Sequence, residues 1–120
     1  MDWSPFLAER PIAVLATVGR DGVPHAVPVE VLVHGGKVYA WCESESVKVA
    51  NVRRTGTAAM LGYKGVSAAL VRGSARLLTS GDAAYDEITK AFLKKYDREE
   101  TYGNDVLVEI SPDRVSAWEN

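Results

Sequence analysis

The sequence has one cysteine, no long apolar run and almost no net charge, and each scarcity excludes a class of protein. Cys42 has no second cysteine with which to form an internal disulfide, which is typical of a reducing compartment. No apolar stretch approaches membrane-spanning length, and the first ten residues are too polar for a secretion signal. The 14 basic and 16 acidic side chains leave a formal charge of −2, so no overall field attracts nucleic acid or an anionic membrane. We expect a cytoplasmic protein with neither partner.

The chain also lacks the side-chain groupings of metal and nucleophile chemistry. His25 and His34 lie nine positions apart without paired ligands, and Cys42 is isolated. These residues give no support for a metal site. No serine or cysteine stands in a recognisable pattern with a base, and no glycine-rich phosphate loop of the Walker or dinucleotide type occurs. The sequence therefore predicts no metal and identifies no catalytic group by motif.

Length and residue pattern predict one mainly β domain that spans residues 1–120. A chain of 120 residues is long enough for one core and too short for two. Period-two alternation puts four valines on one face of a strand: Val27, Val29, Val31 and Val33. Further strand patterns occur at 11–18, 37–44, 57–63, 67–80 and 105–110, and Gly35-Gly36 predicts a tight hairpin between two strands. With two or three peripheral helices, these patterns favour a barrel or sheet of six or seven mostly antiparallel strands.

Local signals predict where individual elements begin and end. Ser4 is the expected N-cap of a short first helix, and Asp82 is the expected N-cap of a last, amphipathic helix. Gly73 stands inside a strand pattern and predicts a bulge or a close backbone approach. After the strand at 105–110, the segment 111–118 is expected to turn into a further strand.

A short helix predicted at residues 46–55 carries the strongest binding signal. Ser46 stands at its N-cap position and Lys48 in its first turn. A helix N-terminus offers free N–H donors and a partial positive charge, which together suit a phosphate. A lysine at this point opposes the helix dipole by about 0.3–1 kcal/mol, so its position invites a functional explanation. The alternative that the residues leave open is a solvated Lys48 paired with Glu43 or Glu45.

Three motifs in a fixed order carry a resemblance to a known family. They are ATVGRDGVPHAVPV at 16–29, KVANVRR at 48–54 and ISPDRVSAW at 110–118. In this order they resemble the pyridoxamine 5′-phosphate oxidase-like split β-barrel family, and more narrowly its small branch that includes F420-dependent enzymes. The similarity runs from about Ile12 to Trp118. It implies a homodimer of split β-barrels of the FMN-binding type, with a flavin-type cofactor, F420 or FMN, in each of two clefts at the interface.

The resemblance also implies roles for individual positions. Ser46 and Lys48 match the residues that hold the cofactor phosphate, while Asn51 and Arg54 would reach this phosphate or the acidic tail of F420. Trp41 and Cys42 would lie beside the phosphate and ribityl portion of the cofactor. The segment on the preceding strand would lie against its ring, largely through backbone groups, and comprises Ala26, Val27, Pro28 and Val29. His25 is the candidate catalytic residue, as a proton or hydrogen-bond donor near the ring. Its alternative is a half-exposed strand histidine without a role in chemistry.

The implied activity is hydride transfer between the cofactor and a small-molecule substrate that the sequence does not identify. In such an oxidoreductase the cofactor does the difficult chemistry, which agrees with the absence of a catalytic motif. The chain departs from the oxidase itself, because PVEVLV at 28–33 replaces a basic run and SAALVRG at 67–73 replaces an Arg-Gln pair. Genuine pyridoxamine 5′-phosphate oxidation is therefore not expected. The alternative function is a non-catalytic protein of the same fold that binds or stores the cofactor.

Overall fold

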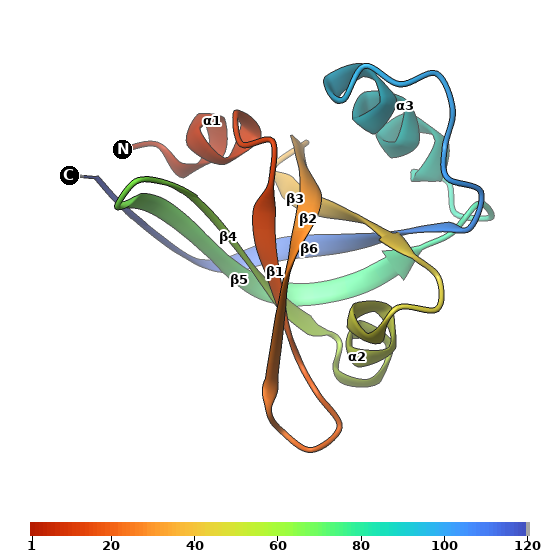
Figure 1. Cartoon of the computed structure of the whole chain (residues 1–120), viewed down its shortest axis with the longest axis horizontal. Helices are drawn as coiled ribbons and strands as arrows, with labels where there is room; N and C mark the ends of the chain where they lie inside the picture. The colour runs from red at the N-terminus through yellow and green to blue at the C-terminus, as the bar shows by residue number, and fades with distance from the viewer. Residues whose placement is uncertain (120) are drawn as a thin grey trace.

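The computed structural model describes residues 1–119, which form a closed barrel of six antiparallel strands with three helices outside it (Figure 1). The elements in chain order are α1 (Trp3–Ala8), β1 (Ala13–Val18), β2 (Pro24–His34), β3 (Lys37–Glu43), α2 (Val47–Thr55), β4 (Thr57–Lys64), β5 (Ser67–Leu78), α3 (Tyr85–Lys95) and β6 (Asp105–Trp118). Neighbouring strands follow the order β1-β2-β3-β6-β5-β4, and β4 closes the barrel on β1. The predicted mainly β fold with peripheral helices is confirmed.

Strand alternation fills the interior of the barrel with apolar side chains. Val29 and Val31 of β2 are buried in the barrel core, and Val27 and Val33 pack against it, as the period-two pattern predicts. Each fully buried valine contributes roughly 1.5–3 kcal/mol through removal of its surface from water. A second, smaller core lies outside the barrel, where α3 packs Phe92 and its neighbours onto β3 and β6.

Glycines set the path of the strands at two places. Gly35 and Gly36 have φ angles of +59° and +77°, and they join β2 to β3 in the predicted hairpin. Gly73 lies at a register shift between β5 and β6, and a Cβ at this position would stand 1.9 Å from the carbonyl oxygen of Ser111. The predicted bulge and the predicted close backbone approach are therefore both confirmed.

Two predicted helix caps are wrong. Asp2 caps α1 instead of Ser4, and its carboxylate accepts a hydrogen bond from the Ser4 N–H at 3.2 Å. Ala84 is the N-cap of α3, while the Asp82 carboxylate accepts from the Thr79 N–H at 2.7 Å in the turn before the helix. Asp and Ser side chains can bond to a turn as readily as to a helix, so residue type alone does not decide which of the two they serve.

The predicted turn within residues 111–118 is also wrong, because β6 continues without interruption to Trp118 beside β5. Pro112 lies opposite Gly73, at the register shift. Proline is tolerated in a strand at a bulge, since the regular ladder of hydrogen bonds is already broken there. Pro112, in the segment predicted to turn, therefore marks the bulge.

β2 changes neighbours along its length, and this change opens the wall of the barrel. Residues 24–29 pair with β1, whereas residues 30–34 pair with β3. Glu30 is the first residue of β2 that pairs with β3, and its partner is Trp41. On the N-terminal side of Glu30, β2 has separated from β3. The helix α2 follows β3 and packs on β1 beside this opening (Figure 1). We call the opening the β2–β3 fork.

Candidate functional site

The N-terminus of α2 forms as predicted, with Ser46 at the N-cap and Lys48 in the first turn. Val49 and Val52 anchor the helix on the barrel core. Ser46, however, donates its hydroxyl to the carbonyl oxygen of Glu43 at 2.8 Å and makes no side-chain cap bond to the helix. Within residues 1–119, the N–H groups of the first turn therefore have no capping side chain and are available to a ligand.

Lys48 is the cation of this helix terminus. It is partly buried, and no acidic side chain among residues 1–119 lies within ion-pair distance of its Nζ, so the alternative pairing with Glu43 or Glu45 is not formed. Lys48 lines a hollow of about 310 Å³ at the β2–β3 fork, which we call the fork hollow. Its other walls come from β2, β3 and the loop before β6, and they include Pro28, Val29, Glu30, Trp41, Cys42, Glu43 and Tyr102.

Cys42 borders the fork hollow but is buried in the barrel core. Burial raises the pKa of its thiol to about 12, although the nearby Lys48 ammonium acts to lower it. The thiol therefore stays protonated at neutral pH, and a protonated thiol is a poor nucleophile. Cys42 contributes the shape of the wall and no covalent chemistry.

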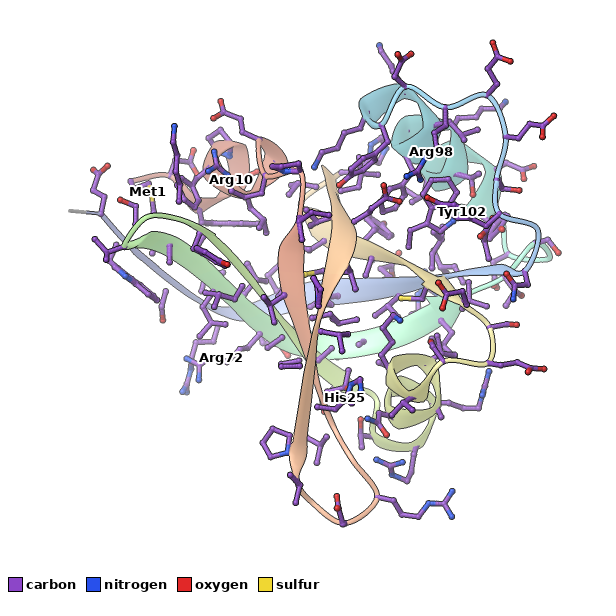
Figure 2. All side chains as sticks on the ribbon, in the orientation of Figure 1. Met1, Arg10, His25, Arg72, Arg98 and Tyr102 are labelled. Atoms are coloured by element: carbon purple, nitrogen blue, oxygen red, sulfur yellow. The ribbon has the colours of Figure 1, made fainter. Side chains whose placement is uncertain are left out.

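An aromatic and ion-pair cluster closes the side of the fork hollow that faces α3. Arg98 donates to both carboxylate oxygens of Glu30 at 2.6 Å, and its guanidinium lies 5.6 Å from the Trp41 ring and 4.7 Å from the Tyr102 ring. Figure 2 shows Arg98 and Tyr102 next to each other beneath α3. The bidentate pair neutralises the Glu30 carboxylate, so this carboxylate does not compete with a bound anion for Lys48.

A second hollow, of about 650 Å³, lies between the β1–β2 hairpin and another face of α2 and is lined by Asn51 and Arg54. Asn51 is 3% exposed, and its amide donates to the Thr17 hydroxyl at 3.0 Å. Arg54 donates to the Asn51 amide oxygen and to the Val18 carbonyl. These bonds tie α2 to β1, a structural role that sequence reasoning missed. The predicted contact of Asn51 and Arg54 with a cofactor stays a prediction.

The predicted ring-binding segment of β2 is divided between two faces. Val27 and Val29 face the barrel core, whereas Ala26 and Pro28 are exposed on the outer face. The edge of residues 24–29 that faces away from β1 pairs with no strand among residues 1–119. Its backbone groups are therefore available to a ligand, and the contact of this segment with a cofactor ring stays a prediction.

His25 is adjacent to this segment and lines the second hollow, beside α2 (Figure 2). Its Nδ1 atom is buried without a hydrogen-bond partner in the described part of the chain. Buried ring nitrogens are normally paired, so this atom is free for a bond to a ligand or a water. The structure thus brings Lys48, Trp41 and Cys42 to one hollow and His25, Asn51 and Arg54 to the other.

Sequence reasoning also missed the contribution of Tyr102, which belongs to a loop read only as polar. Its ring is 59% exposed, and it contacts the Trp41 ring with 5.3 Å between centroids. A lone aromatic residue in an otherwise polar loop is the signal that could have identified it. Among residues 1–119, no three His, Cys, Asp or Glu side chains are placed to hold a metal ion, and no helix is long and apolar enough to span a bilayer.

The chain belongs to the pyridoxamine 5′-phosphate oxidase family, whose model matches residues 2–119. No curated protein matches the sequence significantly. Among solved structures, the conserved hypothetical protein Rv2991 from Mycobacterium tuberculosis is 21% identical with a TM-score of 0.83, over 97% of this chain and 81% of that chain. A putative pyridoxamine 5′-phosphate oxidase from Listeria innocua is 25% identical with a TM-score of 0.76, over 94% and 92% of the two chains. An F420 reductase is 18% identical with a TM-score of 0.77, over 97% of both chains.

More distant structures share the fold under different functional names. The heme storage protein HutZ from Vibrio cholerae is 12% identical with a TM-score of 0.81, over 98% of this chain and 95% of that chain. An FAD-binding protein from Mesorhizobium loti is 17% identical with a TM-score of 0.70, over 96% and 90%. Likeness at this level establishes the fold, and one fold can host several functions. The ligand of this chain must therefore be argued from its own residues.

Proposed function

We propose that this protein binds F420 or FMN and acts as an oxidoreductase that transfers a hydride between the cofactor and a small-molecule substrate. The observation that carries the proposal is the Lys48 ammonium, which pairs with no acidic side chain among residues 1–119 and lies in the first turn of α2, where Ser46 makes no side-chain cap bond. Ammonium, free N–H groups and helix dipole together suit the phosphate that both cofactors carry. Family membership supports a cofactor of the flavin type.

In this proposal the cofactor supplies the hydride chemistry, and the residues of the chain bind, orient and shield it. Ser46 and Lys48 bind the phosphate, with Trp41 and Cys42 beside it. The unpaired backbone edge of residues 24–29 lies against the ring, and the free Nδ1 of His25 gives that residue a bond to offer there. Asn51 and Arg54 hold α2 in position for this contact, since their side chains already bond to each other and to β1.

We further propose a cytoplasmic homodimer with the cofactor clefts at its interface. The support is an exposed aromatic pair at one end of the barrel, where Tyr63 and Trp118 both lie opposite Ala68, one on each side of it. Exposed aromatic side chains gathered on one face are typical of association surfaces. The single free cysteine agrees with a reducing compartment. Light scattering coupled to size-exclusion chromatography tests the dimer, and a monomeric mass at micromolar concentration would contradict it.

The proposed cofactor site is tested by titration of the stripped protein with F420 and with FMN, followed through ligand fluorescence. Lys48→Ala is expected to weaken binding at least tenfold, or about 1.4 kcal/mol, because Lys48 is the only basic residue among the described residues that line the fork hollow. Lys90→Ala, at an exposed lysine of α3, is the matched control and should bind as wild type. Unchanged affinity in Lys48→Ala would refute the phosphate role, and failure of both cofactors to bind would refute the proposed function.

A second candidate function is binding or storage of the cofactor without turnover. Its support is that a protein named for heme storage, HutZ from Vibrio cholerae, shares this fold. The two functions differ in whether reduced cofactor is consumed. The assay is oxidation of the reduced cofactor in the presence of enones, quinones or biliverdin. A rate above that of the free cofactor supports the oxidoreductase, and a rate equal to it across the panel supports storage.

A further inference from the structure

A further hollow, of about 560 Å³, lies on the outer face of the barrel. Its walls come from β1, β2, β4, β5 and β6, whereas the fork hollow lies at β2, β3 and α2. We call it the arginine hollow, and the residues that line it include Ala16, Ala59, Arg72, Asp113 and Arg114. Its volume is within the usual range for pockets that bind small molecules.

Strand register places the floor and the charges of the arginine hollow in one row across the sheet. Ala16 of β1 pairs with Ala59 of β4, and Ala59 pairs with Arg72 of β5. Arg72 pairs in turn with Arg114 of β6. Because directly opposite residues point to the same face of a sheet, two methyl groups and two arginine side chains lie side by side. The short alanine side chains keep the apolar floor low beside the longer arginines.

The two arginines of this row have no acidic partner. Both are exposed, and within residues 1–119 no carboxylate lies within ion-pair distance of either guanidinium. Figure 2 shows Arg72 extending away from the ribbon of β5. Like charges directly opposite each other destabilise an antiparallel pair of strands. A residue pair that costs stability in this way is explained if an anion binds between the two guanidinium groups.

Asp113 is the acidic residue in the wall, and it is directed to the backbone. It is the extra residue of the bulge, since Arg72 pairs with Arg114 and the next residue, Gly73, pairs with Pro112. Its carboxylate accepts a hydrogen bond from the Ser74 N–H at 3.2 Å. The arginine hollow therefore carries more positive than negative charge, and its two cations are free to bind a ligand.

These features define the chemistry of the ligand. The planar guanidinium of arginine matches a carboxylate, with which it forms two parallel hydrogen bonds. Both arginine side chains start in the wall of the hollow, and exposed side chains of this length change rotamer readily, so their guanidinium groups can turn over it. A floor formed by a sheet and by alanine methyl groups suits a flat, apolar group. The combination favours an acid with a flat apolar body.

We infer that the arginine hollow binds a carboxylic acid of this kind, with its carboxylate on Arg72 and Arg114 and its flat body on Ala16 and Ala59. Pro24 lines both this hollow and the second hollow, and it begins the unpaired edge of β2 against which the proposed function places the cofactor ring. The inference rests on the proposed function in so far as the acid is the small-molecule substrate. Binding of the acid itself requires no cofactor.

Titration of the cofactor-free protein with naphthoate tests the inference, because this fluorescent probe joins a carboxylate to a flat apolar ring system. Arg72→Gln and Arg114→Gln are each expected to weaken its binding about threefold or more, since each removes a charge-assisted hydrogen bond at an exposed site. Binding of the uncharged naphthamide should change by less than about twofold. Arg53→Gln, at an exposed arginine of α2 outside the hollow, is the matched control. Failure of naphthoate to bind, or equal effects on acid and amide, would overturn the inference.

A variant of the floor tests the position of the flat body without a change of charge. Ala59→Leu fills the space beside Arg72 and is expected to weaken naphthoate and naphthamide alike by about tenfold or more. Its circular dichroism spectrum should match that of the wild type, since residue 59 lies on the outer face. Unchanged binding of the probe would place it elsewhere and contradict the inference.

Two outcomes separate this inference from the other proposals. If naphthoate binds as expected and neither F420 nor FMN binds, the proposed function fails and the acid site stands. If the arginine variants change the mass of the protein in light scattering while naphthoate binds as in the wild type, a second copy of the chain covers the hollow. That second result would refute the acid site and leave the cofactor site untouched.

Discussion

The bond between Asn51 and Thr17 is expected to stabilise the fold directly, and Asn51→Ala measures its contribution. Both side chains are 3% exposed, and the bond between them is 3.0 Å long. The substitution removes this bond and leaves the Thr17 hydroxyl buried without a partner. Together the two effects should cost about 2–3 kcal/mol of unfolding free energy. Arg54 adds little to this sum, because its exposed guanidinium can bond to water once the Asn51 oxygen is removed. For a chain of this size the expected fall in Tm is about 6–12 °C.

A double-mutant cycle separates this bond from other effects of the substitution. Thr17→Val removes the partner hydroxyl, and the two changes together should cost less than the sum of the single changes by about 1 kcal/mol. The assay is urea unfolding at 25 °C, with Asn104→Ala in an exposed loop as a control expected within about 0.5 kcal/mol of wild type. Additive effects of Asn51→Ala and Thr17→Val would refute the reasoning. Wild-type stability combined with weakened cofactor binding in Asn51→Ala would show instead that Asn51 contacts the ligand directly.

Two further predictions concern charged groups around the second core. Burial raises the pKa of Glu109, but hydrogen bonds from Arg76 at 2.7 Å and Tyr39 at 2.9 Å outweigh it and hold the pKa below 4.5. Glu109→Gln should therefore lower the free energy of unfolding by about 1.5–3 kcal/mol at neutral pH, and the difference from wild type should shrink as the pH falls through the folded-state pKa. A difference that stays constant in urea unfolding from pH 7 to pH 3 would contradict this. Burial, followed by the charge of Arg10, lowers the pKa of Lys95 from 10.5 to about 8. Between these values the unfolded chain binds more protons, so wild-type stability relative to Lys95→Met should rise with pH from 8 to 10, and a flat difference in thermal unfolding would refute it.

Sequence patterns succeeded where a structural feature depends on neighbours in the chain. The valines of β2 alternate because successive side chains of any strand point to opposite faces, and Gly35-Gly36 forms a hairpin because few other residues adopt positive φ. The predictions of the helix N-caps were wrong for a related reason. Asp82 could bond to a turn or to a helix within the same few residues, and only the path of the backbone selected the turn.

In the candidate site, too, features set by neighbours in the chain could be predicted, and contacts between distant residues could not. The placement of Lys48 in the first turn of α2 followed from a local pattern, and the prediction that it binds a phosphate followed from this pattern together with the family resemblance. The contacts of Asn51 could not be read in this way, because its partner Thr17 lies 34 positions away. Arg98 is 68 positions from Glu30, and no local pattern connects the polar loop before β6 to the wall of a hollow on β2.

By itself, the sequence determined a mainly β chain with an antiparallel hairpin, a strand irregularity at Gly73 and a short helix with a lysine in its first turn. Periodicity, glycine conformation and helix capping act over a few residues, so the chain carries them in readable form. Only the tertiary structure decided that β2 pairs with β3 from Glu30 onward and with β1 before it, that a hollow opens at this fork, and that Trp41 lines this hollow. These features arise where β2, β3, α2 and the loop before β6 meet, and the geometry of their meeting is set by the closure of the whole barrel.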